Sequence, residues 1–163
     1  MLDTGWCSLL REKLTMSHQI LVLAEESWPR NTATVNEGLL QGAVALMGEA
    51  RTVLLRLCAD TSQVDGFSGD SLAELKAQVG DQPGEVQILD GLAQQPDSWW
   101  CHLDALLDLQ RKPGGRPDPV PRSEGLIAVA SEAGPDRSVL ALRSLVSEFR
   151  AYFEAFTERH DQW

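Results

Sequence analysis

The residues that most resemble a reactive site lie in the stretch SWWCHLDALLD at 98–108, where Cys101 and His102 directly follow two tryptophans. A thiolate beside an imidazole can bind zinc, or act as a nucleophile with a general base. On a helix, however, neighbouring side chains point about 100° apart, so the two cannot readily share a tetrahedral metal or form a dyad. We interpret the pair as a packed thiol beside an amphipathic imidazole, and we predict no catalytic residue, metal ion or cofactor.

The other segments that could hold an ion or a phosphate lack the spacing they need. The three cysteines, an odd number on separate segments, indicate reduced thiols rather than a disulfide framework. The loop at 60–71 has Val64 and Asp65 where a calcium-binding EF-hand needs an oxygen ligand and a glycine. No glycine-rich phosphate loop follows a convincing strand, which argues against a nucleotide-binding fold.

Arg11 and His18 are the basis of the alternative function. With six residues between them, they resemble the Arg and His pair of HEPN-type ribonucleases, which are small helical bundles. Glu12 follows Arg11 where that family usually has a polar residue such as Asn or His. An acidic chain without a basic groove is also poorly suited to bind RNA.

The elements that must position these residues are predicted to be helices. Apolar residues at helical spacing predict long helices at about 6–28, 34–58 and 137–160, with shorter helices near 71–79, 84–94 and from about 98. The last helix has the cleanest periodicity, with steps of three and four between Val139, Leu142, Val146, Phe149, Phe153, Phe156 and His160.

Helix ends and packing faces follow from the same patterns. Thr34 and Glu37 have the spacing of a capping box, and Asp136 is expected to open the last helix. In the first helix, Met16 and Leu23 are assigned to the apolar side. Gly38 and Gly42 lie one turn apart, which indicates either a close helix–helix approach or simple tolerance.

The predicted fold is therefore all-α, a single helical bundle spanning residues 1–163. A connection at 112–135, rich in proline and glycine, is too long for a tight turn, so it is either mobile or draped over the bundle.

The charge is concentrated in one segment. The chain has a net charge of −10, and residues 60–110 contribute −9 of it, with one base, Lys76. The ten acids are Asp60, Asp65, Asp70, Glu74, Asp81, Glu85, Asp90, Asp97, Asp104 and Asp108. Such a field repels nucleic acid and anionic lipid and attracts a basic partner. The alternative is that the acids lie on solvated helix faces and serve solubility.

The location is predicted to be cytoplasmic. No stretch approaches the roughly 20 apolar residues of a membrane span. The N-terminus has an acid where a signal peptide has its basic region.

We predict a non-enzymatic protein–protein interaction module, a monomer or homodimer, whose partner has a basic surface and is neither nucleic acid nor membrane. The expected contact residues are Trp99 and Trp100, beside an apolar groove, and the acids Asp97, Asp104 and Asp108. A third reading is a small-ligand pocket in the bundle interior.

The stretches NEGLLQGAVALMGEARTVLLRLC and LAELKAQVGDQPGEVQILDGLAQQPDSWWCHLDALL carry a family resemblance. There the chain resembles a family of small uncharacterised gammaproteobacterial proteins, over about residues 5–160. In these a long second helix precedes an acidic region that ends in a Pro-Asp/Ser-Ser-Trp helix start. The resemblance implies an all-helical bundle and brings no assigned activity or functional residue.

Overall fold

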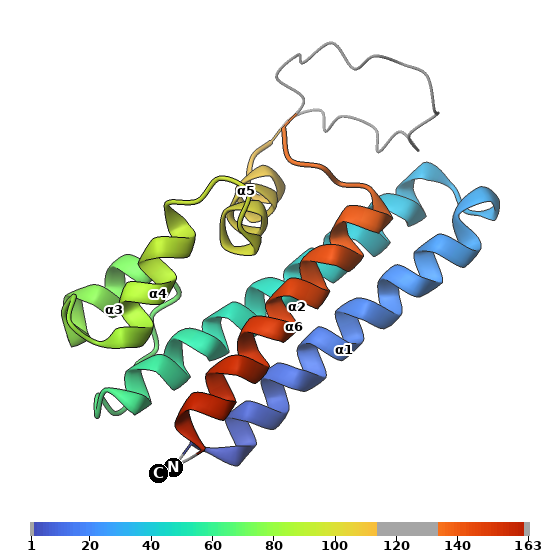
Figure 1. The fold of residues 1–163 in the computed structure, drawn as a ribbon. Coiled ribbons are helices and arrows are strands. Elements are labelled where there is room, and N and C mark those ends of the chain that lie inside the picture. The colour runs from blue at the N-terminus through green and yellow to red at the C-terminus, as the bar shows by residue number, and fades with distance from the viewer. Residues whose placement is uncertain (1, 114–133, 162–163) are drawn as a thin grey trace.

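The computed structural model describes residues 2–113 and 134–161, so most of the predicted connection at 112–135 lies outside the described residues. Every regular element of the described part is a helix, which confirms the all-α class (Figure 1). The elements are α1 (Thr4–Ser27), a 3₁₀ turn (Trp28–Arg30), α2 (Ala33–Thr61), α3 (Leu72–Val79), α4 (Gly84–Ala93), α5 (Trp99–Arg111) and α6 (Val139–His160). None of these helices is both long and apolar enough to cross a bilayer.

The three longest helices lie side by side, and the shorter ones cover α2 (Figure 1). The 3₁₀ turn folds α2 back along α1. Helix α6 runs antiparallel to α1, as ion pairs from Arg143 to Glu25 and from Arg11 to Glu154 show. Helix α5 crosses α2 and also contacts α6, while α3 and α4 lie near the C-terminal end of α2 (Figure 1). This arrangement places residues 70–110 on one side of the molecule.

The start of α2 differs from the sequence prediction. Its N-cap is Thr32, whose backbone is extended and whose hydroxyl accepts a hydrogen bond from the Val35 amide at 3.2 Å. The predicted capping box of Thr34 and Glu37 is therefore wrong. Thr34 lies inside the helix, and the Glu37 carboxylate accepts hydrogen bonds from Arg137 at 2.5 and 2.6 Å. The Glu37 side chain, which the local pattern assigned to a helix cap, forms a long-range ion pair instead.

The start of α6 is also corrected. Its N-cap is Ser138, which accepts a hydrogen bond from the Ala141 amide at 3.2 Å. Asp136 lies two residues earlier, and its carboxylate accepts a hydrogen bond from the Ser138 amide at 2.9 Å. Aspartate therefore forms a local turn before the cap and does not open the helix itself.

The buried side of α1 is a narrow seam in steps of three and four, comprising Cys7, Leu10, Leu14, Ser17, Leu21 and Ala24. Ser17 is tolerated there because its hydroxyl donates to the Ala43 carbonyl at 2.9 Å. Met16 and Leu23 are 36% and 52% exposed, so their assignment to the apolar side is wrong. Only α2 and α6 among the long helices cover α1, which leaves a broad apolar face partly in solvent.

The close helix approach in α2 occurs at Gly48, where α5 crosses. A Cβ atom there would lie 2.9 Å from Cδ2 of Leu107. At Gly38 a Cβ would meet nothing within 4 Å, and at Gly42 the nearest atom is 3.9 Å away. Of the two readings of Gly38 and Gly42, simple tolerance is the one that fits. The seam of α6, by contrast, matches the prediction, because Leu142, Val146, Phe149, Phe153 and Phe156 are all buried.

Candidate functional site

The paired tryptophans belong to the core at the start of α5. Ser98 caps the helix by accepting a hydrogen bond from the Cys101 amide at 3.2 Å. Trp99 stacks on Phe149 with ring centroids 4.3 Å apart, and Trp100 lies beneath the Arg51 guanidinium at 4.9 Å. Each indole is only 5% exposed. The two rings therefore fix α5 against α6 and α2, and a partner would reach little of their surface.

Cys101 and His102 contact different parts of the chain. The Cys101 thiol lies 3.2 Å from the carbonyl oxygen of Ala93, at the end of α4. Nε2 of His102 lies 2.9 Å from the carbonyl oxygen of Asp136, before α6. Within residues 2–113 and 134–161, no group of three or more His, Cys, Asp or Glu side chains could hold a metal ion. Each of the two side chains thus links neighbouring segments.

The three predicted partner-binding acids have exposed side chains on or just before α5. Asp104 pairs with Arg51 at 2.9 Å, and Asp108 pairs with Lys112 at 2.5 Å. Asp97 precedes the helix. Asp104 and Asp108 lie one turn apart, so they project from the same side of α5.

Arg11 and His18, the residues of the ribonuclease alternative, are not joined by any contact. The Arg11 guanidinium donates two hydrogen bonds of 3.0 Å to the two carboxylate oxygens of Glu154 and lies 5.2 Å from the centre of the Phe153 ring. The same hydrogen bonds hold the pKa of Glu154 below its usual value. The cation that a nuclease would need for phosphate is already matched by a carboxylate.

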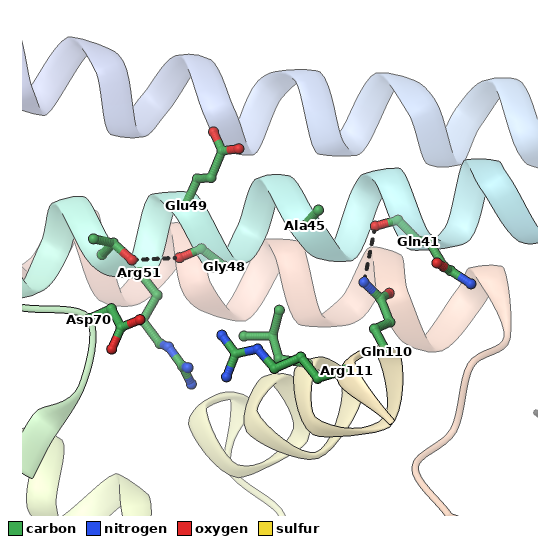
Figure 2. A pocket seen from close by; sticks show the side chains of 10 residues that line it. Gln41, Ala45, Gly48, Glu49, Arg51, Asp70, Gln110 and Arg111 are labelled. Atoms are coloured by element: carbon green, nitrogen blue, oxygen red, sulfur yellow. Dashed lines mark hydrogen bonds between the residues drawn. The ribbon is translucent and has the colours of Figure 1, made fainter. Parts of the chain in front are cut away.

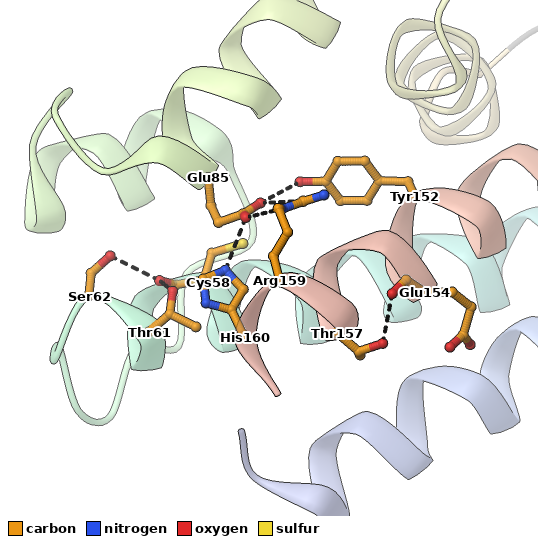
Figure 3. A network of polar contacts seen from close by, with 9 residues as sticks. All are labelled: Cys58, Thr61, Ser62, Glu85, Tyr152, Glu154, Thr157, Arg159 and His160. Carbon is orange, nitrogen blue, oxygen red and sulfur yellow. Dashed lines mark hydrogen bonds and ion pairs between the residues drawn. The ribbon is translucent and has the colours of Figure 1, made fainter. Parts of the chain in front are cut away.

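A buried carboxylate that the sequence did not single out joins α4 to the end of α6 (Figure 3). Glu85 accepts hydrogen bonds from Arg159 at 2.8 and 3.0 Å and from the Tyr152 hydroxyl at 3.2 Å. Nε2 of His160 lies 3.0 Å from Oε1 of the same carboxylate. Burial opposes ionisation, but the hydrogen bonds from Arg159 and His160 outweigh it, and the pKa of Glu85 is lowered.

Two other groups near Glu85 are held in their protonated forms. Burial raises the pKa of the Cys58 thiol and of the Tyr152 hydroxyl. A thiol that stays protonated is a poor nucleophile. The hydrogen bonds of this cluster join Glu85 of α4 to three residues of α6, so the cluster holds α4 against the long helices. We call it the Glu85 lock, comprising Glu85, Tyr152, Arg159 and His160.

Two signals in the sequence bear on the Glu85 lock. His160 continues the apolar seam of α6 one step beyond Phe156, which places an imidazole in a core register. Glu85 sits in the first turn of α4, where an acid is usually explained by the helix dipole. Only the three-dimensional arrangement brings the two together.

A pocket of about 420 Å³ lies between α2 and α5 (Figure 2). Its lining includes two arginines, Arg51 and Arg111, whose guanidinium groups point into the space beside α5 (Figure 2). Gly48 and Leu107 contribute apolar surface where the two helices are closest. We call this cavity the α2–α5 pocket. Its other lining residues include Gln41, Asp70 and Gln110.

The fold and its contacts define an all-helical domain in which long-range ion pairs and aromatic stacking tie short helices onto long ones. Residues 7–163 match the sequence model of a family of unknown function, DUF6586, and the chain belongs to this family. No curated protein and no solved structure matches the chain. Membership agrees with the predicted resemblance to an uncharacterised family.

Proposed function

We propose that the protein is a non-enzymatic interaction module whose acidic side, formed by residues 60–110, binds a basic surface of a partner protein. The observation that carries this proposal is the exposure of the acids. Seven of the ten have exposed side chains, namely Asp65, Asp70, Glu74, Asp81, Asp97, Asp104 and Asp108. Lys76, the one base of the segment, is already paired with Asp81 and Asp90.

The state of the reactive side chains supports a binding role over catalysis. Cys58 is fully buried and Arg11 is paired with Glu154. An active site needs a nucleophile or base within reach of a substrate. Among the described residues, these two groups are engaged inside the fold.

The recognition proposed here is electrostatic and cooperative. An exposed ion pair contributes roughly 0–1 kcal/mol, so useful affinity requires several of the acids together. An excess of acids over bases also speeds encounter with a basic surface. Since the screening length falls from about 8 Å at physiological salt to about 3 Å at 1 M, binding should weaken steeply as salt is added.

The test is capture of partner proteins from an extract of the producing cells, with equal-charge variants compared. One variant carries Asp97→Asn, Asp104→Asn and Asp108→Asn. The control carries Glu12→Gln, Glu26→Gln and Glu158→Gln, three exposed acids of α1 and α6. Wild type and control should capture the same basic protein at low salt, and the aspartate variant should not. Equal capture by both variants would exclude these aspartates as the contact.

Stability must be compared in the same experiment. Asp104 and Asp108 pair with Arg51 and Lys112, and a loss of binding caused by unfolding would mislead. Asp108 and Lys112 are both exposed, so their pair should contribute little to folding. Arg51 is nearly buried and loses its carboxylate partner in the aspartate variant, so this variant should have a lower thermal midpoint than the control. Capture is therefore compared at a temperature at which circular dichroism shows that both variants are folded.

A further inference from the structure

We propose that the α2–α5 pocket binds a small organic molecule that has one carboxylate group and an apolar body. This inference is independent of the proposed partner, because it concerns a cavity between helices and not the exposed acids. It rests on two arginines, of which Arg51 has a carboxylate partner and Arg111 has none among the described residues. It also rests on the apolar residues and the acids that line the same pocket.

Arg51 presents guanidinium N–H groups to the pocket from a nearly buried side chain. The side chain is 8% exposed, and its Nη1 donates to Asp104 at 2.9 Å. Among the described residues, the buried side-chain polar atoms without a partner are Nε of Arg56 and Nε1 of Trp99. The remaining nitrogens of Arg51, which make no hydrogen bond, are therefore accessible to solvent. The Trp100 ring, 4.9 Å from the guanidinium, holds it in place.

Arg111 supplies a second cation from the last turn of α5. Within the described part of the chain it makes no hydrogen bond or ion pair, and its side chain is exposed. Figure 2 shows its guanidinium directed toward the same space as that of Arg51. Two like charges that converge in one pocket are better accommodated with an anion between them. A carboxylate is suited to this position, because each guanidinium can donate two parallel hydrogen bonds.

The remainder of the lining is mixed, with apolar surface for the ligand body where the two helices meet and polar side chains around it. Ala45, Gly48 and Leu107 line the pocket between the helices. A side chain at position 48 would collide with Leu107, so glycine at this position allows the two helices to approach closely at the pocket. The amide nitrogen of Gln110 is directed to the Gln41 carbonyl oxygen at 3.4 Å. Small-molecule sites commonly combine apolar walls with a few polar groups that orient the ligand.

The surrounding charge limits the ligand to a single anionic group. Glu49 points away toward α1, where it pairs with Lys13 at 2.5 Å (Figure 2). Asp70 also lines the pocket, and the chain as a whole has a net charge of −10. A ligand with several negative charges would be repelled by this field. A single carboxylate can bind Arg111, which has no carboxylate partner among the described residues, together with the Arg51 nitrogens that do not contact Asp104.

The experiment uses benzoate as the probe and benzyl alcohol as its uncharged analogue, each titrated into the full chain and followed by backbone amide NMR. Benzoate should shift the amide signals of Gly48 and Gln110 saturably, and benzyl alcohol should bind at least tenfold more weakly. Arg111→Gln should raise the Kd for benzoate about tenfold, the expected effect of losing one charge-assisted contact. Arg30→Gln, which changes an exposed arginine that does not line the pocket, should leave the Kd unchanged.

Several results would overturn the proposal. These are the absence of saturable shifts with benzoate, shifts confined to residues away from α2 and α5, equal binding of benzyl alcohol, and an unchanged Kd in Arg111→Gln. Because Arg111 is exposed, this variant is expected to fold even if substitution of Arg51 is not tolerated. Loss of benzoate binding would leave capture of a basic protein untouched, so the two proposals fail separately.

Discussion

Substitution Glu85→Gln breaks the contact that holds α4 against the last turn of α6, and it should lower the free energy of unfolding by about 2 kcal/mol at pH 7. Removing one partner of a buried ion pair costs about 3–5 kcal/mol when the other charge stays buried. Here the Glu85 side chain is 8% exposed, but Arg159 is 39% exposed and can be rehydrated. The expected cost is therefore at the lower end of that range or below it.

The same substitution should change how stability depends on pH. Because the pKa of Glu85 is lowered from 4.5 in the folded protein, the unfolded chain binds its proton first as pH falls. The stabilisation from the carboxylate is therefore present above about pH 4.5 and is lost as pH falls through the folded pKa. Glu85→Gln has no such group, so wild type and variant should converge in stability as pH falls below about 4.5.

Urea unfolding followed by circular dichroism at several pH values measures both effects. The matched control is Glu158→Gln, which removes an exposed acid from the same region of α6. This control should lie within about 0.5 kcal/mol of wild type at pH 7, as surface substitutions usually do. A Glu85→Gln protein as stable as the control, or a constant difference from wild type at every pH, would refute the reasoning about this buried carboxylate.

Two further predictions concern packing and thiol chemistry. Gly38→Ala should stabilise the protein by about 0.5–1 kcal/mol, because nothing lies within 4 Å of the added Cβ. Gly48→Ala should show no such stabilisation, because its Cβ would clash with the Leu107 side chain. A higher thermal midpoint for Gly48→Ala than for Gly38→Ala would contradict this. In the native protein, Cys101 should be alkylated before Cys58, because Cys58 is buried and its pKa is raised; mass spectrometry after brief iodoacetamide treatment gives the order.

Local patterns in the sequence were sufficient to predict several features of the fold. Ser71 and Ser98 cap α3 and α5 as local patterns lead one to expect, since a small oxygen-bearing residue before an apolar run satisfies the first amides of a helix. The seam from Val139 to Phe156 was clear because a helix packed along its length on other helices keeps one periodicity. Both depend on residues within a few turns of each other.

Features set by distant partners could not be predicted in this way. Glu37 has the spacing of a capping box but binds Arg137, which lies 100 positions later. Glu85 resembles a solvated acid at a helix start, yet Arg159 and His160 surround it from the far end of the chain. The α2–α5 pocket likewise depends on how α5 crosses α2, and no periodicity within either helix specifies that crossing.

The proposed role of the acidic side is tested most directly by the rate at which the captured partner associates at different salt concentrations. Surface plasmon resonance would compare wild type with the variant that carries Asp97→Asn, Asp104→Asn and Asp108→Asn. The wild-type association rate should fall steeply as salt rises from about 0.05 to 0.5 M, and the variant should start slower and fall less, because screening acts on charges that it lacks. Equal rates and equal salt dependence for the two proteins would contradict recognition through these acids.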